Sequence, residues 1–358
     1  MKRSLTSFVH SQNLVLALIV IVGTALLGVS SGGGFFGPIS ITTFFTFLAV
    51  PILIGLAQMI TLAVGQLNLA VGSIGGFAAC LAGVLIADLG VPPVLGGLAA
   101  VLVGAIAGLA NGLLVVVTRI NGFIVTLATM TILLGMQYGL VGTRTISNTS
   151  WPELAALGKA ALLGVPVIFW IAVLIAVLLA FGFTQTVTGR RLLASGGNAT
   201  AAQLAGVSND RSVVVAHTAS GLLCGIAAFV TLASLSGVNQ SIGGDWLLSS
   251  FAAPIIGGVS LTGGSVAVLG TVLAATIVRL VDSARAEFQL APSWVNFVVG
   301  AVVLGTVALG RVREVRAARA ATAPPPGGAS IGTPLATDPT EPPAAPRPLV
   351  DSTPGGDR

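Results

Sequence analysis

Most of this sequence consists of apolar runs long enough to cross a lipid bilayer, separated by short polar connections. Only 8% of the residues are charged, and 54% are hydrophobic, whereas soluble domains carry about 25% charged residues. A bilayer-spanning helix needs about 20 mostly apolar residues, and the runs reach that length. A soluble domain is therefore excluded. A transmembrane β-barrel is excluded too, because it would show alternating segments of about ten residues.

The runs predict an all-α, polytopic membrane protein with about ten transmembrane helices. We place the spans at residues 13–29, 41–64, 71–87, 94–117, 123–141, 166–183 and 213–235, at two short spans within 247–280, and at 294–309. The stretch 247–280 is too long for one span and is interrupted by GGVSLTGGS at 257–265. We interpret it as two crossings joined by a tight turn, and the alternative is a re-entrant segment.

The positions of the basic residues favour a cytoplasmic location for both termini. The residues on that side are then Lys2, Arg3, Arg119, Arg190, Arg191, Arg211, Arg311, Arg313, Arg316 and Arg319, against Arg144, Lys159, Arg279 and Arg285 outside or near it. The expected organisation is a cytoplasmic N-terminus (1–12), a transmembrane permease domain (13–310) and a basic, then disordered, cytoplasmic tail (311–358). The tail is rich in Pro, Ala, Gly and Thr, so it cannot bury a core.

The largest well-patterned polar segment before the tail lies at residues 184–212. Asn198 precedes an Ala-rich stretch with good helix propensity, and Gly206 is a natural helix stop. The pattern predicts a turn at Gly196-Gly197 and a short helix at about 199–205. We interpret the segment as a docking element for a cytosolic ATPase. The alternative is a plain loop whose arginines only set the topology.

A second polar patch, GQLNLAVGSIGG, lies at 65–76 between two apolar runs. Non-helical backbone at membrane depth is tolerated only where it is buried or lines a cavity. Neutral amides and hydroxyls there suit recognition of a sugar. The predicted pathway-lining residues are Gln66, Asn68, Ser73, Asn111, Thr126, Thr129 and Gln137. The alternative is that these side chains bond neighbouring helices.

The sequence shows no catalytic chemistry. The spans contain no paired carboxylates, and no GxxxxGK[ST] phosphate loop is present, so we expect neither an enzyme nor ATP hydrolysis by this chain alone. No metal site is expected, and Cys80 and Cys224 are interpreted as buried free thiols. The net charge of +5 reflects topology-setting arginines rather than nucleic-acid binding. Trp151 is expected to anchor at the membrane interface, and Arg279 to extend toward it.

Five stretches resemble the permease subunit of bacterial ABC importers for monosaccharides of the ribose, xylose and galactose type, the binding-protein-dependent transport system inner membrane component family. They are GQLNLAVGS at 65–73, the segments 111–130, 189–207 and 253–275, and Trp294 with Val298-Val299-Gly300. The resemblance runs from about residue 49 to 309. One departure is Asn68, which stands where the family usually has Asp.

The resemblance implies a multi-pass protein of the bacterial inner membrane that binds no cofactor itself. The implied partners are cytosolic ABC ATPase subunits that use ATP, an extracytoplasmic sugar-binding protein and a second permease copy, identical or not. The residues it assigns to ATPase coupling are Gly189, Arg190, Gly197, Asn198, Ala201, Ala202, Leu204, Ala205 and Gly206. Alternatives are an ABC importer of a nucleoside, a quorum-signal sugar derivative or branched-chain amino acids, and an ion-coupled secondary transporter, which usually carries an ion site near the midplane.

Overall fold

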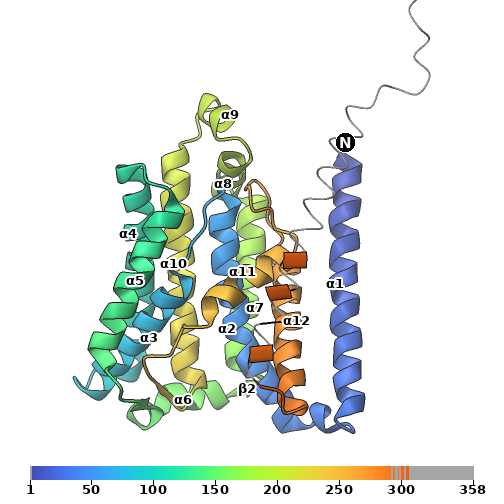
Figure 1. Ribbon diagram of the computed structural model, residues 1–358, viewed down its shortest axis with the longest axis vertical. Coiled ribbons are helices and arrows are strands. Elements are labelled where there is room, and N and C mark those ends of the chain that lie inside the picture. The colour runs from blue at the N-terminus through green and yellow to red at the C-terminus, as the bar shows by residue number, and fades with distance from the viewer. Residues whose placement is uncertain (1, 292, 295–296, 298–299, 302–303, 306–358) are drawn as a thin grey trace, which may run out of the picture. The chain divides into compact units, whose positions relative to one another are not determined.

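The computed structural model describes residues 2–291 and, beyond them, 293, 294, 297, 300, 301, 304 and 305. This part of the chain is mostly helical (Figure 1). The helices are α1 (Lys2–Ser30), α2 (Pro38–Ala63), α3 (Val71–Ala87), α4 (Pro93–Thr118), α5 (Gly122–Val141), α6 (Pro152–Lys159), α7 (Val167–Gln185), α8 (Val187–Gly197), α9 (Ala199–Leu204), α10 (Asn209–Ser234), α11 (Trp246–Ile256) and α12 (Val268–Glu287), with 3₁₀ turns at Gly34–Phe36 and Asn148–Ser150. Two short antiparallel pairs join β1 (Ile146–Ser147) to β4 (Gly237–Val238) and β2 (Ala161–Leu162) to β3 (Val165–Pro166).

Six helices in the described part of the chain are long and apolar enough to cross a membrane. They lie in α1, from Gln12 to Ser30, and in α2, α4, α5, α7 and α10, and each matches a predicted span to within about one helical turn. The chain is therefore a polytopic helical membrane protein. The count of ten spans and the location of the termini stay predictions. The predicted span 294–309 falls largely outside the described residues, and the tail 311–358 wholly so.

The short helices α3 and α11 begin inside the helix bundle rather than at its ends. Each is preceded by non-helical backbone: the first non-helical segment, residues 65–70, leads into α3, and the second, residues 239–245, leads into α11. Gly65 and Gly243 adopt left-handed conformations, with φ of 71° and 85°, which side-chain-bearing residues rarely adopt. In the stretch 247–280, α11, with 11 residues, precedes the turn at 257–265 and α12 follows it, and the prediction that the two helices cross the membrane separately stays a prediction.

Glycine allows close helix packing between α4 and α10. A Cβ at Gly104 would overlap the backbone of Gly221 and Gly225, and a Cβ at Gly108 would overlap the backbone of His217 and Gly221. Small residues at such contacts let helix backbones approach closely in lipid. Helix α2 lies beside α10 and beside α7, α11 and α12, and its centre is fully buried, for example at Ile52 and Leu56.

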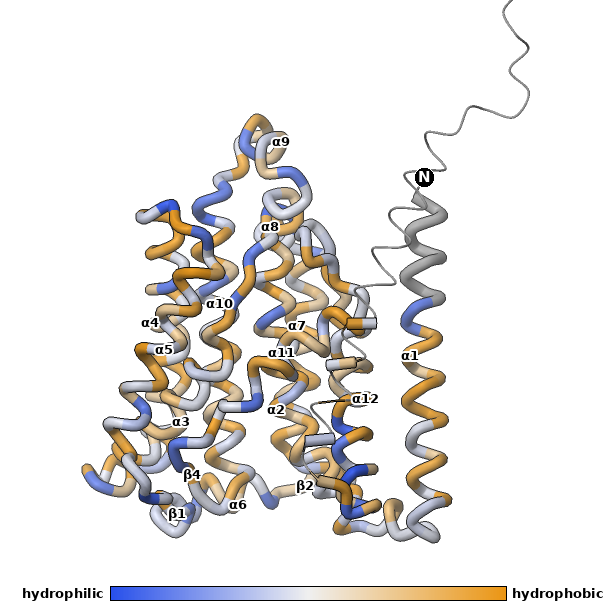
Figure 2. The backbone as a smooth tube through the Cα atoms, viewed as in Figure 1, coloured by the Kyte–Doolittle hydropathy of each residue, from blue (hydrophilic) through white to orange (hydrophobic). Residues whose placement is uncertain are grey.

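The end of the bundle opposite α9 is held by backbone pairing and by a buried tryptophan. The indole Nε1 of Trp151 donates to the carbonyl of Leu232 at 3.0 Å, and the side chain is fully buried. The predicted role of Trp151 as an interfacial anchor is therefore wrong. At the same end Arg144 forms an ion pair with Asp88. The hydrogen bonds that the Arg144 guanidinium donates to the Asp88 carboxylate raise the pKa of Arg144. Figure 2 shows hydrophilic positions near β1, at the α8–α9 end and along α12.

Candidate functional site

Helices α8 and α9 form a polar projection at one end of the bundle (Figure 1). Thr186 caps α8 by accepting from the N–H of Gly189 at 3.1 Å. Asn198 caps α9 by accepting from the N–H of Ala201 at 2.9 Å. The chain leaves α9 through Gly206, whose φ is 80°. The short helix predicted at about 199–205 is thus confirmed within one residue, with the predicted glycine stop.

The predicted turn at Gly196-Gly197 is wrong, because α8 continues through both glycines. The helix needs Gly196 for close packing rather than for a turn. A Cβ there would overlap the carbonyl of Ala63 and the N–H of Gly264. The N–H of Gly264 also donates to the carbonyl of Ala63 at 3.0 Å. The end of α8 therefore touches both the end of α2, which leads to α3, and the turn that follows α11.

The residues predicted to couple to an ATPase lie together on this projection. Most are exposed, and Gly189 and Ala202 are buried. Leu204 is 87% exposed, which makes it the most prominent apolar side chain of α9. The exposed members of the predicted set are Arg190, Gly197, Asn198, Ala201, Leu204, Ala205 and Gly206. Two surface hollows, of about 470 and 250 Å³, meet at Gly206 and Ser208 beside α9.

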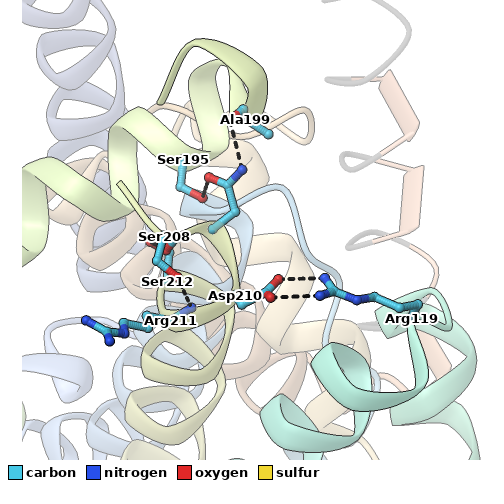
Figure 3. Close-up of polar contacts among 8 residues, drawn as sticks. Arg119, Ser195, Ala199, Ser208, Asp210, Arg211 and Ser212 are labelled. Atoms are coloured by element: carbon cyan, nitrogen blue, oxygen red, sulfur yellow. Dashed lines mark hydrogen bonds and ion pairs between the residues drawn. The ribbon is translucent and has the colours of Figure 1, made fainter. Parts of the chain in front are cut away.

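Asn209, at the start of α10, joins α10 to α8 and α9, and Figure 3 labels its partners Ser195 and Ala199. Its Oδ1 accepts from the Ser195 hydroxyl of α8 at 2.9 Å, and its Nδ2 donates to the carbonyl of Ala199 in α9 at 2.8 Å. The neighbouring Asp210 accepts two hydrogen bonds from Arg119, at 2.7 and 2.9 Å. The projection is thereby joined to the packed pair of α4 and α10. Sequence reasoning missed Asn209 and Asp210, although both follow Ser208, a typical N-cap residue.

The predicted pathway residues near α3 hold the first non-helical segment in place. Asn68 is fully buried, its Nδ2 donates to the Ser220 hydroxyl at 3.1 Å, and its Oδ1 accepts from the N–H of Ala70. The Thr126 hydroxyl accepts from the N–H of Leu69 at 3.1 Å. With its amide oriented to match, Gln58 pairs with the backbone carbonyl and N–H of Asn68, at 2.9 and 3.3 Å. Buried backbone groups thus obtain the partners that lipid cannot supply.

The other predicted pathway residues are also engaged within the protein. Thr129 donates to Asn111 Oδ1 at 2.6 Å, which joins α5 to α4. Gln137 Nε2 donates to the carbonyls of Gln240 and Ile242, at 3.2 and 3.0 Å, and so holds the second non-helical segment. Ser73 donates to the carbonyl of Ala70. Gln66 is half-buried, and its amide oxygen lies beside Gly122.

A cavity with both apolar and charged lining residues, which sequence reasoning missed, lies between α2, α10, α11 and α12, toward the end opposite α9. Its volume is about 340 Å³, and its lining includes Asp245, Trp246, Arg279 and Asp282. Arg279 is 14% exposed and pairs with Asp282, and its extension toward the membrane interface stays a prediction. The signal in the sequence was the charged residues inside the α12 run, since ionisable groups at membrane depth commonly mark functional sites.

Comparisons with known proteins identify what this arrangement is similar to. The model of a family described as "Branched-chain amino acid transport system / permease component" matches residues 40–307. The fructose import permease protein FrcC of Rhizobium meliloti is 29% identical over 324 residues, covering 88% of this chain and 90% of the relative. The autoinducer 2 import system permease protein LsrC of Yersinia pseudotuberculosis is 28% identical, covering 86% and 87%, and that of Escherichia coli is 27% identical, covering 86% and 89%. No solved structure matches the chain.

Proposed function

This chain belongs to the family of branched-chain amino acid transport system permease components, whose model spans most of its helical part, and we propose that it is the membrane subunit of an ABC importer for a monosaccharide. The observation that carries the proposal is its similarity, over most of its length, to permeases named for fructose and autoinducer 2 import. These names keep a quorum-signal sugar derivative open beside the ribose-like or xylose-like substrate that the motifs suggest. A protein of this family lies in the bacterial inner membrane.

The proposed route for ATP-driven motion begins at α8 and α9. A cytosolic ATPase would dock on the exposed face of α9, with Leu204 entering a groove of the partner. Asn209 would pass the displacement to α8 and α10 through its two hydrogen bonds. The contact of Gly196 with Ala63 and Gly264 would carry it to the segments next to α3 and α11. Motion of the short helices α3 and α11 would open the pathway alternately to each side of the membrane.

The proposed assembly has two permease copies, two ATPase subunits and an extracytoplasmic sugar-binding protein. In this arrangement α9 is cytoplasmic, both termini lie on the same side, and the charge bias of the loops is satisfied. The binding protein would deliver the sugar to the end opposite α9. The residues around α3 and α5 that hold the non-helical segments would then set the pathway geometry rather than grip the sugar individually.

A branched-chain amino acid importer is the second candidate, because the family description names that substrate class. The relatives covering most of this chain carry names of sugar and autoinducer 2 systems instead, which favours the first candidate. Both candidates share ATP-driven import, so transport of labelled D-fructose, D-ribose, D-xylose and L-leucine separates them.

The test is uptake by the chain reconstituted in proteoliposomes with its ATPase and binding protein. The proposal predicts uptake of one of the sugars that requires ATP and the ATPase. Uptake driven by a sodium or proton gradient without partners would refute it and support an ion-coupled carrier. A matched control is the same complex with an ATPase that binds but cannot hydrolyse ATP.

A further inference from the structure

The cavity between α2, α11 and α12 has the size and chemistry of a small-ligand site. Its volume of about 340 Å³ lies in the range of about 300–1,000 Å³ usual for such pockets. Its walls combine apolar residues of α2 with polar residues of the second non-helical segment and α12. None of the pathway residues predicted from sequence lines it. The cavity is therefore separate from the residues predicted to line the pathway.

One wall of the cavity is a buried cation in an apolar setting. The Cζ of Arg279 lies 5.3 Å from the ring centroid of Phe47 and 5.9 Å from that of Phe44. Asp282 pairs with Arg279 and accepts from Arg285 Nε at 3.1 Å. The Nε of Arg279 is buried and has no hydrogen-bond partner among the residues that the structure describes. A buried charge is costly unless it is paired and fully hydrogen-bonded, so the position of Arg279 calls for a functional reason.

The lining also includes a carboxylate acceptor, Asp245, and an aromatic surface, Trp246. Asp245 is exposed to the cavity, and within the described part of the chain it forms no ion pair. Its side chain does not cap α11, so both carboxylate oxygens are free to accept hydrogen bonds. The adjacent Trp246 packs one part of its indole against Gly75, where a Cβ would overlap the ring, and also lines the cavity.

We propose that this cavity binds the transported solute on the side opposite α9, and that it selects an uncharged, hydroxyl-rich molecule. The inference rests on the proposed function. A sugar ring presents apolar C–H groups, which suit the Trp246 indole, and hydroxyl groups, which can donate to Asp245. Hydrogen bonds to a carboxylate are about twice as strong as neutral ones. Asp282 pairs with both Arg279 and Arg285, so the lining carboxylate without an ion pair among the described residues is that of Asp245, and it disfavours the anionic groups of sugar acids and phosphates.

Cysteine labelling tests whether the cavity is aqueous and whether sugar fills it. Ser249 lines the cavity, and the two native cysteines are buried. In the full complex, S249C should react with membrane-impermeant methanethiosulfonates, and the cationic reagent should react faster than the anionic one. D245N should remove that preference. T131C is the matched control. Thr131 is exposed on α5, away from the cavity, and α5 is long and apolar enough to cross the membrane. Lipid should therefore cover the residue and keep it unlabelled.

Protection by sugar decides the proposal. Whichever of D-fructose, D-ribose or D-xylose the wild-type complex transports should slow S249C labelling severalfold, and L-leucine should not. Unchanged labelling in the presence of that transported sugar overturns the inference while leaving the importer function intact. If S249C does not assemble, T46C on the α2 wall gives the same readout. Failure of the complex to transport any of the sugars refutes the proposed function, whatever the labelling shows.

Kinetics give an independent check. D245N should raise the KM for sugar uptake by about tenfold, the equivalent of one strong hydrogen bond, with the ATP-driven maximum rate little changed. S249F should fill the cavity and abolish uptake, whereas T131F should not. An unchanged KM in D245N together with normal uptake by S249F would overturn the site assignment.

Discussion

On the short helix α9, Ala202 faces the protein and Leu204 faces away from it: Ala202 is 5% exposed and Leu204 is 87% exposed. An apolar side chain so exposed on a polar projection is expected to be covered by a partner. Ala202 instead packs within the projection, so enlarging it would distort α9 itself. Tests of docking therefore belong at Leu204, and tests of the local fold at Ala202.

The substitution L204D should uncouple the complex. If Leu204 fills a groove of the ATPase, losing it removes an interface anchor worth about 2 kcal/mol, so stimulated ATPase activity and uptake should fall by about tenfold or more. Membrane insertion should be unchanged. L163D is the matched control, because Leu163 is 86% exposed in the β2–β3 turn. Equal losses in both variants would show that exposed leucines matter only for general stability.

The substitution G196A should destabilise the protein, and G197A should not. A Cβ at Gly196 would overlap backbone atoms of Ala63 and Gly264, whereas one at Gly197 would lie an ordinary 3.7 Å from the Gly264 Cα. Overpacking of this kind costs about 1–3 kcal/mol. Thermal unfolding of the purified proteins in detergent measures the difference. Equal midpoints in G196A and G197A would contradict the close contact of α8 with the end of α2 and with the turn that follows α11.

The substitution N68D should be tolerated, and N68L should not. In the aspartate variant the Ser220 hydroxyl can donate to the carboxylate, the N–H of Ala70 keeps its acceptor, and the start of α3 favours negative charge. Leucine removes both hydrogen bonds and leaves buried polar groups unpaired, at a cost of about 1–3 kcal/mol each. Uptake and thermal stability should be near normal in N68D and reduced in N68L. The reverse order would contradict the hydrogen bonding described for Asn68.

The substitution Q137L should release the second non-helical segment. It leaves the partly buried carbonyls of Gln240 and Ile242 without this donor, at a cost of up to about 1–3 kcal/mol each. The account predicts a lower thermal midpoint and weak uptake even when the protein is inserted. Q185L controls for the loss of an amide, because Gln185 is exposed at the end of α7. A normal midpoint in Q137L would show that other groups hold the segment.

The sequence predicts the long helices well, because hydrophobicity along the chain responds directly to the bilayer. The bounds of α3 are reproduced, and those of α5 within one residue. The cap at Asn198 and the stop at Gly206 are equally local signals, so the sequence alone predicts α9. In each of these cases the controlling interactions lie within a few residues of sequence.

The features that sequence reasoning missed depend on distant partners. Gly196 looks like a turn residue until the backbone of Ala63 and Gly264 is seen beside it. Trp151 resembles an interfacial anchor until its bond to Leu232 is known. The cavity needs Asp245, Arg279 and Phe47 from three separate elements, and no spacing in the sequence brings them together. The start of α11 inside the bundle likewise depends on Gln137 of α5.

The central claim is that α9 meets an ATPase inside the cell, and a photo-crosslinking residue placed at position 204 tests it most directly. Irradiation of cells that produce the complete importer should give an adduct containing this chain and the ATPase subunit, with a yield that changes when ATP is depleted. An adduct only with extracytoplasmic proteins, such as the sugar-binding protein, would contradict the account.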